Sequence, residues 1–289
     1  MKDIEVKGHS GCQIEVKQEG RTNYLYKYTK DPKYFGRLVR QGEKQQAMHN
    51  MENLHICVPQ IYEIEQHETI VILKMQYVYS KNFVEFFELA GFEQILALIN
   101  ALCNFVESEI QQCEIANISK QVFIDKFDEI HQKCKINELC CNDNRIESIL
   151  KQAQEVFSNL DVMKLPVGMC HGDLTFSNLL FSGNNYYLID FLDSFIETPL
   201  QDIVKIRQDT QHNWSPLMYA KPYDNIRMSI IFKKIDQEID SYFNKKYLWY
   251  TNYYNIMQLM NLLRILPYVK EKKVLSFLEL ELSRVINEF

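Results

Sequence analysis

The sequence predicts an α+β protein with two lobes: a small antiparallel β lobe that contains one helix, and a larger, mainly helical lobe. Three observations predict this class. The chain has 289 residues, which exceeds the length that a single hydrophobic core usually stabilises. Of these residues, 46% are hydrophobic. Residues 1–79 carry strand patterns, and beyond residue 80 the apolar spacing becomes helical. We therefore expect one lobe over 1–79 and a second over 80–289.

Four segments of the first part alternate apolar and polar side chains, or run in β-branched and aromatic residues. They read IEVK (4–7), QIEVKQ (13–18), NYLYKYT (23–29) and TIVILKMQYV (69–78). Residues 34–51 break this pattern, because apolar residues from Leu38 to Met48 recur at helical spacing among charges. One helix is therefore predicted to interrupt an antiparallel sheet.

Helical patterns dominate from residue 80 onward. The strongest covers 92–110, where apolar residues from Ile95 to Val106 form one broad face. Further helical patterns fall near 120–134, 144–160, 201–211, 225–244, 250–266 and 271–288. In this part of the sequence, only 179–191 has a strand pattern, so the second lobe is predicted to be mainly helical.

The charge pattern narrows the class of partner. Thirty-two Lys and Arg stand against 38 Asp and Glu, and no long basic run could follow a phosphate backbone, so we expect no nucleic-acid partner. The N-terminal MKDIEVKGHSGC has no apolar core typical of a signal peptide, and no segment has the 18 or so apolar residues that span a bilayer. We expect a cytoplasmic protein without a membrane partner.

The eight cysteines lack the CxxC spacing of zinc or redox motifs, so most are expected to be reduced, buried side chains. The densest group, His131, Cys134, Cys140 and Cys141, leaves a metal site open as an alternative. Its spacing matches no known ligand pattern, which favours ordinary packing.

Polar side chains with catalytic spacing stand in CHGDLTFSNLLF, residues 170–181. Asp173 and Asn178 lie five residues apart, as do the Asp and Asn of a kinase catalytic loop. Asp190 follows twelve residues later, at the end of a predicted strand. Phosphoryl transfer needs Mg²⁺ held by oxygen ligands, a role that suits Asn178 and Asp190. It also needs a separate carboxylate facing the acceptor hydroxyl, which predicts Asp173 as the catalytic residue.

A structural alternative exists for this motif, because Asp and Asn often cap turns. That reading explains each residue singly. It does not predict a second carboxylate at the expected distance on a strand, so the catalytic reading is favoured. His171 is expected to support the loop by hydrogen bonding.

HGDLTFSN, followed by LIDFLDSFIETPLQDIVKI, resembles the catalytic and metal motifs of the aminoglycoside phosphotransferase and choline/ethanolamine kinase superfamily. The resemblance covers 171–206 and implies a protein-kinase-like two-lobed fold. It implies Mg²⁺ as cofactor, ATP or GTP as phosphate donor, and a small-molecule hydroxyl as acceptor, in an amino alcohol, an aminosugar or a sugar. Asp202 resembles the family residue that steadies the catalytic loop, although Glu197 and Thr198 replace the usual Gly-Asp before it.

The first lobe supplies candidate nucleotide-binding residues. Lys27 lies on a predicted strand and Glu43 on the predicted helix, the order of the phosphate-binding lysine and its partner in kinases. KMQYVYSKN resembles a kinase hinge, with Met75 behind the base and Gln76 and Val78 offering backbone groups. Gly8 and Gly11 form a looser glycine turn than GxGxxG, in which backbone amides near the phosphates are expected.

The sequence predicts the chemical class of the acceptor but no single molecule. Carboxylates and aromatic residues after the motif suit a cationic amino alcohol or aminosugar. The candidates are Asp193, Trp214, Trp249 and Tyr253. Eight residues between Asp190 and Pro199 leave little room for a peptide platform, which disfavours an atypical protein kinase. A catalytically silent nucleotide-binding or interaction module is the alternative, and the sequence predicts no particular oligomeric state.

Overall fold

The computed structural model describes residues 6–7, 12–51 and 56–289. These residues form two compact units. The first unit comprises Met1–Ser108, His171–Ser194 and Ser215–Ile231, and the second comprises Glu109–Cys170, Phe195–Trp214 and Phe232–Phe289. The lobe boundary near residue 79 stays a prediction. The glycine turn with Gly8 and Gly11 lies outside the described residues.

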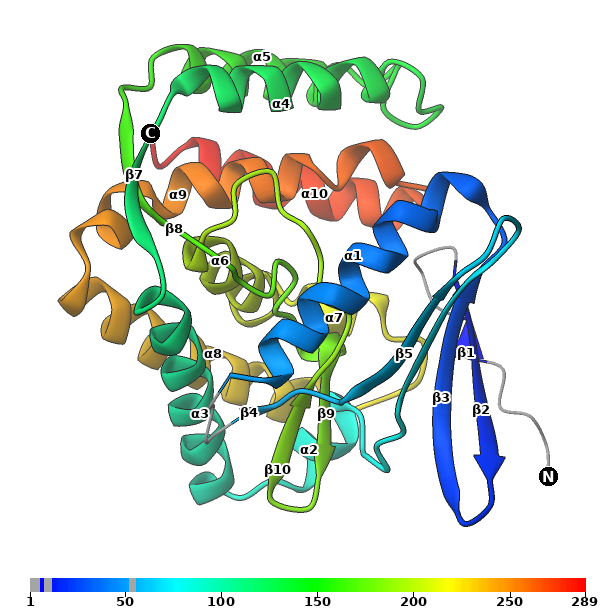
Figure 1. Ribbon diagram of the computed structural model, residues 1–289. Coiled ribbons are helices and arrows are strands. Elements are labelled where there is room, and N and C mark those ends of the chain that lie inside the picture. The colour runs from blue at the N-terminus through cyan, green and yellow to red at the C-terminus, as the bar shows by residue number, and fades with distance from the viewer. Residues whose placement is uncertain (1–5, 8–11, 52–55) are drawn as a thin grey trace. The chain divides into compact units, whose positions relative to one another are not determined.

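The first unit contains a five-stranded antiparallel sheet with the order β1-β2-β3-β6-β5 (Figure 1). Its strands are β1 (Val6–Lys7), β2 (Gln13–Glu19), β3 (Thr22–Thr29), β5 (Ile61–Gln66) and β6 (Val71–Gln76). The predicted strands in 13–18, 23–29 and 69–78 are confirmed. Strand β5 was not predicted, because the edge strand IYEIEQ exposes most of its side chains and carries little apolar alternation.

Helix α1 (Pro32–His49) packs on this sheet and confirms the predicted helix. It begins after Asp31, whose Oδ1 accepts a hydrogen bond from the Lys33 N–H at 3.0 Å. The buried face consists of Leu38, Gln41, Gly42, Gln45 and Met48. These residues are three or four positions apart, so they lie on one face of the helix. This face of α1 is the one that meets the strands.

The core beneath α1 joins the helix to the sheet. Its fully buried members are Cys12, Leu38, Ile61, Val71, Leu73 and Met75. A Cβ at Gly42 would lie 2.8 Å from Cδ2 of Leu73, so glycine lets the helix backbone approach β6 closely.

A three-stranded sheet, also in the first unit, carries the motif that contains Asn178. Its order is β4 (Ile56–Cys57), β10 (Asn185–Leu188) and β9 (Leu179–Ser182), with β10 parallel to β4 and antiparallel to β9. Both β9 and β10 lie in the predicted strand region 179–191. Helix α2 (Phe83–Leu89) packs on β9 and is followed by α3 (Phe92–Ile110).

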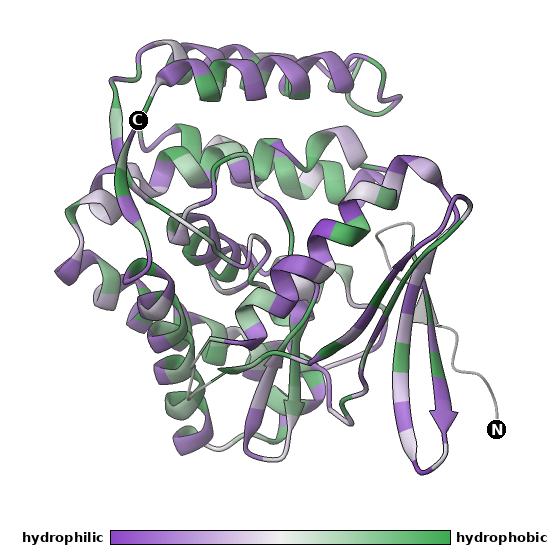
Figure 2. Ribbon diagram, viewed as in Figure 1, coloured by the Kyte–Doolittle hydropathy of each residue, from purple (hydrophilic) through white to green (hydrophobic). Residues whose placement is uncertain are grey.

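The second unit is mainly helical. Its helices are α4 (Lys120–Cys134), α5 (Asn144–Ser158), α6 (Pro199–Thr210), α9 (Leu248–Leu263) and α10 (Lys272–Ile286), with a short turn η2 (Leu266–Tyr268). Helices α7 (Trp214–Met218) and α8 (Asn225–Lys246) each contribute residues to both units. Hydrophobic residues gather along α9 and α10, whereas α4 and α5 are more hydrophilic (Figure 2). Residues 256–263 of α9 are all buried, which makes α9 the central helix of this unit.

Two strands of the second unit correct the prediction that 179–191 alone is extended beyond residue 80. Strand β7 (Glu114–Ile118) pairs antiparallel with β8 (Met163–Val167). Each has five residues and β8 contains Pro166, which weakens the local strand signal. The pairing joins segments almost fifty residues apart in sequence, a contact that local periodicity does not predict.

The cysteines of the described structure are all free thiols. Cys134 and Cys140 are buried, and the hydrogen bond between their thiols raises the pKa of Cys134 and lowers that of Cys140. Within the described ranges, no three His, Cys, Asp or Glu side chains are arranged to hold a metal ion. The group from His131 to Cys141 is therefore not brought together as a metal site. The helices described here are also too short or too polar to cross a bilayer.

Candidate active site

The loop from His171 to Asn178 is fixed by the His171 ring. The ring is fully buried, and its Nδ1 accepts a hydrogen bond from the Asp173 N–H at 3.1 Å. Its Nε2 lies 2.8 Å from the Ile189 carbonyl oxygen. Because Nδ1 accepts, Nε2 carries the hydrogen and the ring is neutral. These bonds tie the loop to the segment that holds Asp190, which agrees with the supporting role predicted for His171.

Asn178 orients Asp173. The Asn178 Nδ2 donates to the Asp173 backbone oxygen at 2.8 Å and to its Oδ2 at 3.0 Å. The short turn η1 (Phe176–Asn178) places the two residues together, with the Asn178 N–H bonded to Thr175 O at 3.0 Å. The amide therefore does cap the turn, as the structural alternative required. Both bonds use Nδ2, so Oδ1 is the Asn178 atom suited to a cation.

Asp190 is brought to the same loop by backbone pairing. The Ile189 N–H donates to Asn178 O at 3.0 Å, and the Leu192 N–H donates to His171 O at 2.9 Å. Asp190 itself has φ +62°, a left-handed conformation that is uncommon for a residue with a Cβ. Two segments that flank the β9–β10 hairpin thus place Asn178 and Asp190 near each other.

Gly172 makes this backbone crossing possible. It has φ +86°, and a Cβ there would lie 2.2 Å from the Leu192 carbonyl oxygen. Gly20, in the turn between β2 and β3, has φ +61° but open space around it. The two glycines therefore share the left-handed backbone and differ in the close approach.

We predict that Gly172→Ala lowers the free energy of unfolding by about 1–3 kcal/mol more than Gly20→Ala does, because only the first change also forces two backbone segments apart. Urea unfolding of the two variants and the native chain measures the difference. Equal losses would contradict a requirement for close packing at Gly172.

Lys27 reaches Asp190 from the five-stranded sheet. Its Nζ lies 2.7 Å from Asp190 Oδ1, although the two residues are 163 positions apart. The Lys27 side chain is 5% exposed and that of Asp190 is 40% exposed. A buried ammonium therefore meets a carboxylate whose other side is open to solvent.

The expected partner of Lys27 on the helix is corrected by the structure. Lys27 Nζ lies 3.3 Å from Oε1 of Gln41, whereas Glu43 is exposed. Gln41 belongs to the buried face of α1 that begins at Leu38, and Glu43 lies two positions beyond it, on another face. The spacing of that face could have identified Gln41 from the sequence.

The residues predicted to form the hinge lie at the end of β6 and just after it. Met75 is buried, and its Sδ lies 4.0 Å from Nε2 of Gln45. The Gln76 N–H is already bonded to Gln60 O at 2.8 Å, so that amide is not open to a base. Val78 lies half-buried in the extended segment after β6.

The acceptor candidates are divided between the two units. Asp193 pairs with Arg40 at 2.7 Å, and both side chains are exposed. In the second unit, Trp214 packs on Phe277, Trp249 stacks on Tyr247, and the Tyr253 hydroxyl accepts a hydrogen bond from Lys164 N. The three aromatic residues have three different neighbours. Asp202 is fully buried in the first turn of α6, also in the second unit.

A model of a family described as "Phosphotransferase enzyme family" matches residues 13–221, which include Lys27, the catalytic loop and Asp190. The chain belongs to this phosphotransferase family. Curated protein sequences give no match.

Solved structures agree with the phosphotransferase fold. A thermostable mutant of aminoglycoside phosphotransferase APH(4)-Ia, in a ternary complex with AMP-PNP and hygromycin B, is similar with a TM-score of 0.66 and 9% identity, over 99% of this chain and 93% of that chain. A putative fructosamine-3-kinase from Haemophilus somnus has a TM-score of 0.62 and 13% identity, with 99% and 91% covered. Spectinomycin phosphotransferase APH(9)-Ia, in complex with ADP and spectinomycin, has a TM-score of 0.54 and 12% identity, with 99% and 88% covered. The α+β, kinase-like fold predicted from the sequence is therefore confirmed.

Proposed function

We propose that this phosphotransferase-family protein is a small-molecule kinase that moves the γ-phosphoryl group of ATP or GTP to a hydroxyl group. One observation carries the proposal: within one compact unit Lys27 is bonded to Asp190, Asn178 is bonded to Asp173, and the N–H of Ile189, next to Asp190, is bonded to Asn178 O. A turn that satisfied its own backbone would not require a buried lysine from a distant strand. Phosphoryl transfer requires this combination of a cation, two carboxylates and an amide.

Asp173 is proposed to take the proton of the acceptor hydroxyl. Its Oδ2 accepts from Asn178, which fixes the orientation of the carboxylate. Its backbone N–H is bonded to Nδ1 of the buried His171 ring, which fixes the loop beneath the carboxylate. A half-buried, oriented carboxylate can bind the hydroxyl and accept its proton as transfer proceeds.

Asp190 and Asn178 are proposed to hold Mg²⁺. The donors fit this cation, because a carboxylate and an amide oxygen are hard oxygen ligands and Asn178 uses Nδ2 for its protein bonds. When bound, Mg²⁺ would neutralise charge on the nucleotide phosphates. Lys27 holds Asp190 in position and, as the buried ammonium of the site, is proposed to bind phosphate oxygens.

The nucleotide is proposed to bind beside the segment from Met75 to Val78. Because the Gln76 N–H is already used by Gln60, we assign the main backbone contact with the base to Val78. Relatives with this fold were solved with ADP or AMP-PNP, which supports a nucleotide donor.

The acceptor is proposed to be a polar small molecule with hydroxyl groups. Similar structures hold hygromycin B, spectinomycin or, in an amicoumacin kinase, its named ligand Ami. The exposed ion pair of Asp193 with Arg40 is the kind that contributes little stability, so Asp193 could exchange Arg40 for a cationic acceptor. Trp214, Trp249 and Tyr253 as acceptor contacts, and Asp202 as a support of the catalytic loop, also stay predictions.

The contact between Gln41 and Lys27 gives a prediction with a matched control. Gln41→Ala should lower kcat/KM for the nucleotide about tenfold, since a hydrogen bond to a charged group contributes roughly 1.5–3 kcal/mol. Glu43→Ala, a truncation of similar size two residues away on an exposed face, should leave kcat/KM within about twofold. A larger effect at Glu43 than at Gln41 would show that Glu43 turns to Lys27 during catalysis.

Nucleotide binding tests the proposal before an acceptor is known. Thermal unfolding is measured with ATP or GTP, each with Mg²⁺ or with EDTA. We expect a Mg²⁺-dependent rise in Tm with at least one nucleotide, because a ligand that binds the native state adds about 2.7 kcal/mol at a hundredfold excess over Kd. No shift at millimolar nucleotide would favour a silent interaction module, and phosphate transfer to a protein acceptor would favour an atypical protein kinase.

A further inference from the structure

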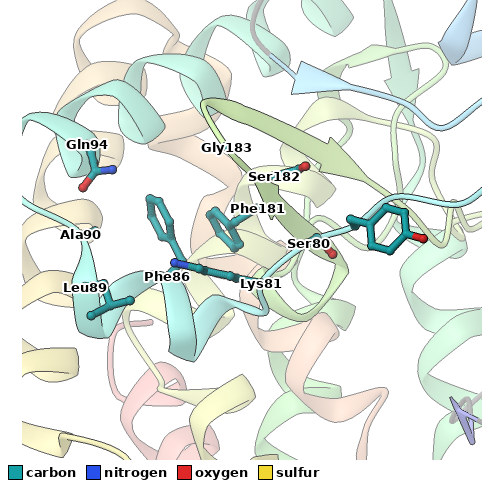
Figure 3. Close-up of a pocket in the computed structure, with 10 residues that line it drawn as sticks. Ser80, Lys81, Phe86, Leu89, Ala90, Gln94, Phe181, Ser182 and Gly183 are labelled. Carbon is teal, nitrogen blue, oxygen red and sulfur yellow. The ribbon is translucent and has the colours of Figure 1, made fainter. Parts of the chain in front are cut away.

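A pocket lies in the first unit, on segments that follow the proposed hinge and the catalytic loop in the sequence. Its volume is about 350 Å³, at the lower end of the roughly 300–1,000 Å³ typical of ligand pockets. It is formed by residues 79–81, the C-terminal end of α2, Gln94 at the start of α3, and the end of β9 with the turn that follows it (Figure 3). None of the proposed catalytic, metal or nucleotide residues lines it.

The floor of this pocket is aromatic. The rings of Phe86 and Phe181 stack with centroids 4.1 Å apart and planes inclined by 13°. They are 9% and 3% exposed, so their positions are fixed by packing. Leu89 extends the apolar surface and is 71% exposed. A flat, rigid apolar floor with an open edge suits a ring that lies against it.

One cation faces this floor. The Lys81 backbone is held in place, because its N–H and carbonyl both bond to Phe181, at 2.8 and 3.1 Å. Figure 3 shows the Lys81 side chain running along the two rings toward Leu89. In the part of the chain that the structure describes, its ammonium forms no ion pair or hydrogen bond. The hydroxyls of Ser80 and Ser182 and the amide of Gln94 complete the polar lining.

The alternation of side chains along β9 fixes the side of the strand on which this pocket lies. Successive strand residues point to opposite faces, so Phe181 and its neighbour Leu180 cannot face the same side. Phe181 faces α2, where it stacks on Phe86. A ligand here would therefore lie on the α2 side of β9.

We propose that this pocket binds a small aromatic carboxylate, with its carboxylate on Lys81 and its ring on Phe86 and Phe181. The exposed ammonium of Lys81 selects an anion, because a carboxylate can form a charge-assisted hydrogen bond with it and a neutral ring cannot. The volume accommodates one ring with a short acidic arm. A site of this kind is independent of phosphoryl transfer, and the proposal stands whether or not the chain is an active kinase.

Phenylacetate is the probe, and phenylacetamide is its neutral counterpart of the same shape. Titration calorimetry and ligand-observed NMR on the full chain without nucleotide should give saturable binding at millimolar concentration, as expected for about ten heavy atoms. Lys81→Met keeps an unbranched side chain of similar shape without the charge and should weaken phenylacetate at least tenfold, while Lys33→Met, on an exposed part of α1, should leave the affinity unchanged. Leu89→Glu, an exposed position, should weaken it as well by adding a like charge.

Several results would overturn the proposal. They are an absence of saturable binding, equal affinity of phenylacetate and phenylacetamide, and unchanged affinity in Lys81→Met with native Tm. Complete displacement of phenylacetate by AMP-PNP with Mg²⁺ would show that the probe occupies the nucleotide site instead, and would also overturn it. Simultaneous binding of phenylacetate and AMP-PNP is the result expected.

Discussion

Asp190→Asn is expected to reduce phosphoryl transfer by at least about a thousandfold. The carboxylate is the one charged Mg²⁺ ligand proposed for this site, and the charge stabilisation supplied by a metal contributes several kcal/mol to the transition state. The substitution keeps the shape of the side chain and an oxygen that can accept from Lys27. The loss should therefore appear in Mg²⁺-dependent nucleotide binding and in kcat, with little change in fold.

Two controls separate catalysis from folding in this experiment. Asp161→Asn makes the same change at an exposed residue of the second unit and should leave turnover and Tm unchanged. Asp190→Ala removes the charged partner of Lys27 and should also lower Tm, because Lys27 would remain buried with only the neutral Gln41 beside it. Turnover of Asp190→Asn within about tenfold of native would rule out Asp190 as the metal ligand.

Asp173→Asn is expected to lower kcat by roughly 10²–10⁴, the range contributed by general acid–base catalysis. The amide cannot accept a proton at neutral pH, so the acceptor hydroxyl would lose its base. Affinity for the nucleotide should stay close to native, because Asp173 is assigned to the acceptor. Steady-state kinetics with the best acceptor, together with the thermal shift by Mg²⁺ and nucleotide, measures the two effects separately.

The opposite pattern would reassign Asp173. If Asp173→Asn weakens nucleotide binding and leaves kcat within about tenfold, the residue serves the metal or the loop. The hydrogen bonds from Asn178 to Asp173 make a loop role the specific alternative. Asn178→Ala then provides the comparison, since it should impair metal binding under the present assignment and mimic Asp173→Asn under the other.

The sequence predicted those parts of the site that depend on local spacing. Asp173 and Asn178 are five residues apart, and one turn brings them into contact. The strand pattern of 179–191 correctly predicted a return of the chain toward Asn178. Lys27 was found because its strand pattern was strong, and its ion pair with Asp190 agrees with the proposed site.

Other features depend on contacts that local patterns do not contain. The helical spacing of the buried face of α1 does mark Gln41, but only the structure shows that Gln41, and not Glu43, lies beside Lys27. Strands β7 and β8 pair across a long sequence separation and include a proline. The pocket at Lys81 arises where four segments meet, and no single segment carries a signal for it.

Product analysis tests the central claim most directly. The native chain and the Asp173→Asn variant are incubated with Mg²⁺, ATP or GTP, and a panel of amino alcohols, aminoglycosides and sugars, and ³¹P NMR follows the phosphate. The account predicts a new phosphomonoester signal from one acceptor class with the native chain, and a signal at least a hundredfold slower to form with the variant. Equal rates of product formation in the two proteins, or tight Mg²⁺-dependent nucleotide binding with no phosphomonoester from any class, would contradict it.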